Sequence, residues 1–530
     1  MSRLAPAILL LFAAPALAQT PGTCQLGTAE ADLNIGDVRA RVFNTGALFF
    51  GQGTTDGTGY LVPKDTGRSP LYAQGLWIGG TVGGDLRVAG ATYGDFEFWP
   101  GPLGLGAALP NPDDCSPYDR IWLVDVFDVQ QYDETGDATA DLAEWPLALG
   151  APVVDGDGVE GNYDLAAGDR PEIYGHQTAF WVMNDVGNEH ERYGTEPIGL
   201  EVRVTAFASA EPELAQQSFY RYELVNRNSL PFEDARFGFF VDPDLGDAAD
   251  DYVGSDSTRH LAFAYNATNA DDIYGTPPPA VGHDFLSGGA TAMNYEGPPG
   301  CVPTADPCTA TDMYNRLSGL WNDGTPMTEG GNGYQTDGPV VEWVFPGDPA
   351  SEQFWSGLNV DGEGSDYLAG DRQYSISGPA FSLAPGESQV FDFAVLFATG
   401  MDHLDSVTAL KGLSDAVQAR YDEGMLFAPS EVPVAAEDGA AALTTARLDA
   451  VYPNPVRDRA TVAFAVAEPG PVRLTVHDVL GRRVRTLAEG PLAAGEHSAT
   501  FDAAGLRSGI YLMVLEAGGQ RATRKVMIVR

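Results

Sequence analysis

The chain has 530 residues and a formal net charge of −44, because 74 acidic residues outnumber 30 basic ones. Such a surface repels nucleic acid and anionic membranes, so we predict no nucleic-acid partner. Hydrophobic residues make up 44% of the chain, which excludes a disordered acidic tail and allows two or more substantial cores.

Residues 1–18 have the pattern of a signal peptide. Arg3 gives a basic start, an uncharged apolar run follows over 4–14, and Ala16 and Ala18 supply the small residues of a cleavage site. We expect cleavage before Gln19 and a mature chain outside the cytoplasm. The apolar run is shorter than the roughly twenty residues that span a bilayer, so we predict no transmembrane segment.

Four cysteines in an exported chain predict two disulfides, with three possible pairings. Cys301 and Cys308 bracket a short loop that contains proline, and this favours a local bridge between them. Cys24 would then pair with Cys115.

Residues 19–425 form an acidic region whose pattern is mostly β. Alternating apolar residues predict strands over 200–207, 219–225, 235–241, 260–266 and 390–397. Apolar residues at helical spacing predict one helix over 405–421, with Ser406 as its cap. We expect a large β-sandwich of one or two units, with this helix packed on it.

A change in charge marks a second domain. Residues 441–530 hold 8 acidic and 12 basic residues, which leaves 66 acidic and 18 basic residues in the rest of the chain. An alanine-rich stretch precedes the change, so we predict a linker over 426–445 and a domain over 446–530. Short alternating strands between Gly and Asp turns predict a small Ig-like β-sandwich there.

This domain carries motifs of a known family, in the following positions: Tyr452, Pro453, Asn454 and Pro455 at its opening, Gly481 in a D-x-x-G turn, Gly509 and Tyr511 in a later strand, and Lys525 before the last strand. In this order the motifs resemble the type A sorting domain of the type IX secretion system of Bacteroidota. The last part is also similar to the Ig-like domain of flagellar hook-capping proteins, although the export signal fits the sorting domain better. The resemblance implies that the type IX machinery is a partner and that the protein is secreted or attached to the outer-membrane surface.

The N-terminal region resembles large exported proteins of the same bacteria whose activity is undefined. The segments that carry this resemblance include LWIGG at 76–80 and YGDFEFWPG at 93–101. It brings no catalytic residues with it.

Acidic loops are the candidate sites for chemistry, because clustered carboxylates in flexible loops supply the hard oxygen ligands that calcium needs. The first group consists of Asp242, Asp244, Asp247, Asp250, Asp251 and Asp256. The second group consists of Asp155, Asp157, Asp164 and Asp169, and a weaker third of Asp361, Glu363, Asp366 and Asp371. Solvated acidic loops without an ion are the alternative.

These patterns favour a calcium-stabilised binding or structural protein with a glycan or protein ligand. The alternative is an extracellular hydrolase acting on polysaccharide, since a glycosidase needs only two carboxylates across a cleft. Most of the eight tryptophans are expected in the core, and Trp99 is the best candidate for a surface ring. His176 and His190 are interpreted as structural residues.

Overall fold

The computed structural model describes residues 21–50, 59–289, 291–295, 300–351, 354–429, 447–452, 456, 459–467, 469–478, 482–507, 509–518 and 520–528. They form two compact units, Met1–Val124 with Ala140–Pro429, and Asp125–Thr139 with Ser430–Arg530. The predicted signal peptide and residues 430–445 of the predicted linker lie outside the described residues.

The first unit contains a ten-stranded antiparallel sheet, whose main path runs β1-β2-β3-β5-β14-β19-β18. Its strands are β1 (Glu30–Leu33), β2 (Arg39–Phe43), β3 (Ala47–Leu48), β4 (Tyr60–Leu61), β5 (Ala73–Val82), β6 (Asp85–Gly90), β14 (Phe232–Asp242), β18 (Thr291–Tyr295), β19 (Gln373–Ser377) and β20 (Phe381–Leu383). β14 lies at the centre and pairs with both β5 and β19.

A second sheet of nine strands follows the path β15-β16-β17-β21-β13-β12-β11-β7. Its strands are β7 (Trp99–Pro100), β8 (Trp122–Asp125), β11 (Gln177–Asn184), β12 (Leu200–Ala208), β13 (Ser218–Asn226), β15 (Asp251–Asp256), β16 (Leu261–Asn266), β17 (Ala280–Phe285) and β21 (Ser388–Ala398). All five strands predicted from alternation are therefore present.

Aromatic rings join the two sheets into one sandwich. Phe237 of β14 stacks on Phe391 of β21, and Phe239 packs against Phe393, with ring centroids 4.5 Å apart in both pairs. Tyr222 of β13 contacts Phe237 at 5.4 Å. Buried aromatic pairs of this kind contribute about 0.5–1.5 kcal/mol each beyond their burial.

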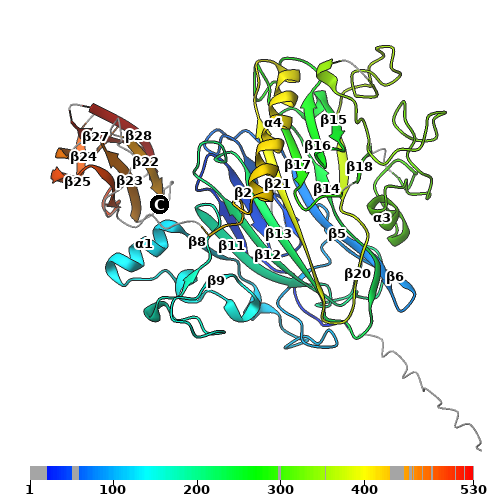
Figure 1. The fold of residues 1–530 in the computed structure, drawn as a ribbon, viewed down its shortest axis with the longest axis horizontal. Helices are drawn as coiled ribbons and strands as arrows, with labels where there is room; N and C mark the ends of the chain where they lie inside the picture. The colour runs from blue at the N-terminus through cyan, green and yellow to red at the C-terminus, as the bar shows by residue number, and fades with distance from the viewer. Residues whose placement is uncertain are drawn as a thin grey trace, which may run out of the picture. The chain divides into compact units, whose positions relative to one another are not determined.

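The predicted helix is α4 (His403–Asp422), which lies along the outer face of the nine-stranded sheet (Figure 1). Val407 and Leu410 share a buried cluster with Leu261 and Phe263 of β16, so the prediction of its packing is confirmed. The expectation for Ser406 is wrong, because the cap is Asp402, which accepts from the N–H groups of Leu404 and Asp405. Ser406 lies buried within the helix.

The other described helices are short: α1 (Val126–Thr135), α2 (Ala140–Ala143), α3 (Ala310–Leu317), and the 3-10 turns η1 (Ser116–Tyr118), η2 (Leu147–Leu149), η3 (Leu165–Ala167), η4 (Ala248–Asp250) and η5 (Pro349–Ser351). A small ribbon pairs β9 (Val153–Val154) with β10 (Arg170–Pro171). Among the described residues, no helix combines the length and the apolar composition that crossing a membrane would require.

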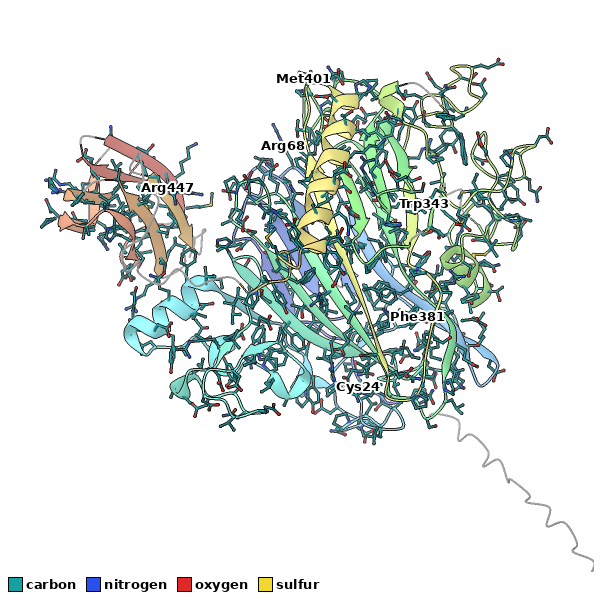
Figure 2. All side chains as sticks on the ribbon, viewed as in Figure 1. Cys24, Arg68, Trp343, Phe381, Met401 and Arg447 are labelled. Atoms are coloured by element: carbon teal, nitrogen blue, oxygen red, sulfur yellow. A yellow bond between two sulfur atoms is a disulfide. The ribbon has the colours of Figure 1, made fainter. Side chains whose placement is uncertain are left out.

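Both predicted disulfides are confirmed. Cys24 bonds to Cys115, and Cys301 bonds to Cys308 across a sequence separation of 7 residues. Cys24 lies at the rim of the first unit (Figure 2), where the bridge packs against Trp99.

The C-terminal part of the chain forms a sandwich of a three-stranded sheet, β22-β23-β26, and a four-stranded sheet, β25-β24-β27-β28. Its strands are β22 (Arg447–Tyr452), β23 (Arg459–Val466), β24 (Gly470–Asp478), β25 (Arg483–Leu492), β26 (Gly495–Asp502), β27 (Gly509–Ala517) and β28 (Gln520–Ile528). Phe464, Phe501 and Leu515 belong to one buried core shared by the two sheets. The predicted small β-sandwich is therefore present.

Candidate functional site

Three carboxylates from distant parts of the chain form the strongest candidate site. One oxygen atom each of Asp242, Asp244 and Asp371 lies within 4.8 Å of the other two. The register of the first sheet brings them together, because Val241 of β14 pairs with Tyr374 of β19. The end of β14 therefore lies beside the residues that enter β19.

Asp242 has one oxygen that the protein does not satisfy. The residue is 5% exposed, and its Oδ2 accepts a hydrogen bond of 2.8 Å from the hydroxyl of Tyr93. That hydroxyl also accepts a bond of 2.7 Å from Nε2 of Gln373. The buried Oδ1 of Asp242 has no hydrogen-bond partner among the described residues. Leaving a buried charged oxygen without a partner costs more than about 1–3 kcal/mol, and a bound cation would remove that cost.

The charges at this site repel one another. Burial, reinforced by Asp244, raises the pKa of Asp242 to about 8. Burial, reinforced by Asp371, raises the pKa of Asp244 to about 6. A divalent cation with hard oxygen ligands would favour the ionised forms, so the donor set of Asp242, Asp244 and Asp371 fits calcium.

The second predicted group also comes together in part. Oxygen atoms of Asp155, Asp157 and Asp169 lie within 4.8 Å of one another. Backbone amides hold these carboxylates: Asp169 accepts from Gly156 at 3.0 Å and from Asp164 at 2.7 Å. These bonds lower the pKa of Asp169. The carboxylate of Asp164 instead caps η3 through the N–H groups of residues 166 and 167.

The remaining acids of the first group lie elsewhere. Asp250 and Asp251 lie near Asp271, a residue that the sequence did not single out. Burial, reinforced by the charge of Asp271, raises the pKa of both Asp250 and Asp251. Asn266 donates to Asp250 at 2.7 Å, and the N–H of Asp247 donates to Asp271 at 2.9 Å. The fully buried Oδ1 of Asp251 has no hydrogen-bond partner in the described part of the chain.

Asp256 forms ion pairs with two basic side chains. Its Oδ2 lies 2.7 Å from Nη1 of Arg259, and Lys411 lies 3.9 Å away. Hydrogen bonds from Thr258 and Arg259 lower its pKa despite partial burial. Two cations therefore already neutralise the carboxylate that was predicted as a metal ligand.

The third predicted group is dispersed. Asp371 joins Asp242 and Asp244, whereas Asp361 closes its own loop by accepting from the N–H groups of Glu363 and Ser365. Glu363 and Asp366 are exposed. The pairing of β14 with β19, which period-two patterns do not reveal, decides which of these acids reaches the site.

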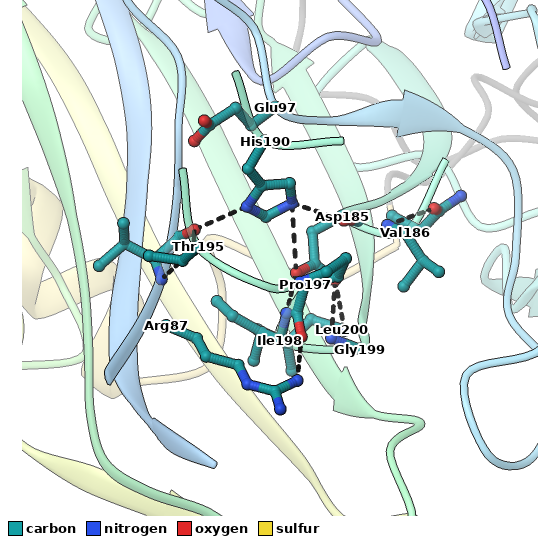
Figure 3. Close-up of polar contacts among 12 residues, drawn as sticks. Arg87, Glu97, Asp185, Val186, His190, Thr195, Pro197, Ile198, Gly199 and Leu200 are labelled. Carbon is teal, nitrogen blue, oxygen red and sulfur yellow. Dashed lines mark hydrogen bonds and ion pairs between the residues drawn. The ribbon is translucent and has the colours of Figure 1, made fainter. Parts of the chain in front are cut away.

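A buried imidazole and two buried carboxylates form a separate polar network (Figure 3). Nδ1 of His190 lies 2.8 Å from the carbonyl oxygen of Val88, and Nε2 lies 2.7 Å from that of Asp185. Because a carbonyl oxygen can only accept, the ring takes part in these two contacts as a donor. The buried side chains of Asp185 and Glu97 lie close to the ring, with Oδ2 of Asp185 3.8 Å from Nε2.

Both carboxylates of this network are committed to the backbone. Glu97 accepts from the N–H groups of Gly90, Arg192 and Tyr193 at 3.0–3.1 Å. Asp185 accepts from three consecutive N–H groups over 198–200. Although burial raises the pKa of both acids, these bonds hold their oxygens in fixed positions that support loops.

All eight tryptophans are buried, so the expectation for the core is confirmed. The expectation that Trp99 is a surface ring is wrong. Trp99 belongs to β7, is 4% exposed, and packs against the disulfide between Cys24 and Cys115. The neighbouring Pro100-Gly101 turn suggested a loop, but the bridge covers the ring.

The described part of the predicted sorting motif lies in the strands of the C-terminal sandwich. Gly509 opens β27, and Tyr511 in the same strand donates its hydroxyl proton to the carbonyl oxygen of Arg507. Lys525 lies in β28 opposite Leu512, and Tyr452 ends β22. Pro453, Asn454, Pro455 and Gly481 lie outside the described residues.

Fold and motif together define an exported protein whose C-terminal β-sandwich acts as a sorting signal. Residues 450–529 match the family model described as "Secretion system C-terminal sorting domain". The resemblance to the type IX sorting domain of Bacteroidota is thereby confirmed, and the protein is secreted or attached to the cell surface through the type IX machinery. The resemblance of the N-terminal region is not confirmed.

No curated protein matches the chain. Among solved structures, a polysaccharide lyase is similar over 71% of this chain, with 11% identity and a TM-score of 0.19. The chain spans only 42% of the length of that lyase.

Proposed function

We propose that the protein is a calcium-stabilised binding or structural passenger that type IX secretion delivers to the outside of the cell. Two observations support the calcium site: the buried Oδ1 of Asp242 has no partner in the described residues, and one carboxylate oxygen each of Asp242, Asp244 and Asp371 lie within 4.8 Å of one another. The ion would join the end of β14 to the chain that enters β19. It would act on stability, because it binds the folded chain and not the unfolded one.

An extracellular location suits such a site. Extracellular calcium modules work with dissociation constants of about 10⁻⁴–10⁻³ M, which a site with three carboxylates and an exposed member can reach. Asp371 is the exposed member of the site. Loss of the ion would leave three mutually repelling carboxyl groups together in a chain that is already strongly acidic.

The test is thermal unfolding of the mature full-length protein with calcium and with a chelator. We expect calcium to raise the melting temperature by several degrees, since saturation at 100 times the dissociation constant adds about 2.7 kcal/mol. Asp371→Asn should remove most of this rise. Asp366→Asn, which removes the same charge from an exposed position in the same loop, should leave it intact.

Equal calcium responses in Asp371→Asn and Asp366→Asn would rule out this site. A response that depends on Asp157 instead would move the ion to the second group. No calcium response in the wild type would remove the argument for a metal.

The hydrolase alternative concerns polysaccharide outside the cell. Glu97, which lines a cavity of about 430 Å³ together with Asp95 and Glu189, is the buried acid best placed for such chemistry. Its three backbone hydrogen bonds oppose a role in proton transfer. Release of reducing ends from polysaccharides by the wild type, lost in Glu97→Gln, would favour the hydrolase over the binding protein.

A further inference from the structure

A long irregular connection separates β18 from β19, and it contains α3, η5 and the short disulfide loop. Its described residues are held by side chains inside the connection: Nε1 of Trp321 donates to Gly333 at 3.0 Å, and Nε1 of Trp355 donates to Gly331 at 2.9 Å. Trp343, labelled in Figure 2, is also buried there. Long connections that are ordered by their own side chains are usually functional, often as binding loops.

This connection contains a pocket of about 560 Å³, a size suited to a side chain or a small ligand. Trp355, Pro339 and Val360 supply apolar walls. Phe354 also lines the pocket, yet its side chain is 72% exposed. Its backbone is held at a φ of +64°, a conformation that residues other than glycine rarely adopt. The chain thus presents an aromatic ring to solvent at the pocket.

The pocket has a single sign of charge. Glu329 and Asp361 are the acidic residues among those that line it, and the described lining contains no basic side chain. Hydrogen bonds from Ser365 and from the N–H of Glu363 lower the pKa of Asp361 to about 2. The carboxylate therefore stays ionised at every physiological pH. An open aromatic face beside fixed carboxylates attracts an organic cation and repels uronic acids and phosphates.

We propose that this pocket binds an arginine side chain presented by a protein partner. The planar guanidinium can stack on the open face of Phe354 while its N–H groups pair with Asp361 or Glu329. This inference names a ligand class for the proposed binding passenger. It does not depend on calcium, because the pocket shares no residue with the group of Asp242, Asp244 and Asp371.

Titration calorimetry of the mature full-length protein with a Gly-Arg-Gly-Arg-Gly peptide tests the pocket. We expect Phe354→Ala to weaken binding about three- to tenfold through loss of the cation–π contact, and Asp361→Asn to weaken it by a similar factor. Leu368→Ala removes an equally exposed apolar side chain outside the pocket, and Asp366→Asn removes a nearby charge. Both controls should bind within about twofold of the wild type. Melting temperatures measured for all four variants separate a loss of binding from a loss of folding.

Several results would overturn the proposal. If all four variants bind the peptide equally, the attraction comes from the general negative charge of the protein. If a neutral oligosaccharide binds the wild type and Phe354→Ala abolishes that binding while peptide affinity is unchanged, the pocket is a sugar site. No binding of the peptide at millimolar concentration also overturns the assignment. If the arginine assignment fails but Phe354→Ala keeps the calcium-dependent rise in melting temperature, the proposed calcium site still stands.

Discussion

Asp242 illustrates how burial and like charges act on a single carboxyl group. Both effects favour the protonated form, so without a cation the folded chain holds a proton that the unfolded chain releases. One oxygen of the same carboxyl group, Oδ1, lacks a hydrogen-bond donor among the described residues. The carboxylate is therefore more costly to the apo protein than to the calcium-bound protein.

The melting temperature of the calcium-free protein should fall as the pH rises from about 5 to 8. In the folded chain the pKa of Asp242 is raised to about 8 and that of Asp244 to about 6. The two groups therefore stabilise the fold fully when the pH is below their pKa in the unfolded chain, and this stabilisation is lost as the pH rises through about 6 and about 8. Calcium replaces the protons, so the calcium-dependent rise should grow over the same range. Melting curves at four pH values, with calcium and with chelator, measure both trends. Asp242→Asn separates the contribution of this site from that of other buried acids, because it should flatten part of the slope of melting temperature against pH. A calcium effect that does not change with pH would contradict the assignment.

His190→Leu should destabilise the fold by about 3 kcal/mol, because it leaves the carbonyl oxygens of Val88 and Asp185 without their hydrogen-bond partner in a buried site. His176 provides the matched control. It accepts a hydrogen bond from the N–H of Ala210 and lies within 3.2 Å of the Ser209 hydroxyl, so it is held as a neutral ring. His176→Leu should cost clearly less. Urea unfolding of both variants gives the comparison, and equal losses would argue against a special structural role for His190.

At the scale of elements, side-chain periodicity predicted five strands of the passenger and α4, but not the helices α1 and α3. Both of these have capping boxes, formed by Asp125 with Asp128 and by Thr309 with Asp312. The cap signals are present in the sequence, but the helices are too short for a clear apolar repeat. Periodicity also could not show that Asp371 meets Asp242, since that contact depends on how strands far apart in the chain pair.

The role of Asp402 as the cap of α4 can be tested by mutation. Asp402→Ala should lower the free energy of unfolding by about 1 kcal/mol, since it removes the acceptor for two N–H groups at the start of the helix. Asp422→Ala, at the other end, removes the same charge without removing a cap and should be neutral or slightly stabilising. Chemical denaturation of both variants compares them. A loss for Asp422→Ala as large as for Asp402→Ala would contradict the role of the cap.

At the scale of the whole molecule, charge divides the chain. The passenger carries all of the excess acid, whereas residues 441–530 have more basic than acidic residues. The sequence alone predicted the sorting domain, because its motifs are local. The ligand of the passenger could not be predicted, since its pocket lies in an irregular connection that has no periodic pattern.

Deletion of residues 446–530 should retain the protein in the periplasm, because the sorting domain is the part that the type IX machinery recognises. Cell fractionation, with the full-length chain expressed in parallel, measures the distribution. Truncated protein found on the cell surface at normal levels would refute the sorting role. The melting temperature of the retained passenger shows whether misfolding causes the retention.

The position of β21 sets the order in which the passenger can fold. This strand lies between β13 and β17 in the nine-stranded sheet, although about 170 residues of sequence separate it from β13. The middle of that sheet, and the aromatic layer that β21 shares with β14, cannot form until residue 398 has been delivered. Such non-local pairing makes folding slow. A chain that emerges from its N-terminus thus stays open until most of its length is available, and it completes the core of the passenger just before its sorting domain emerges.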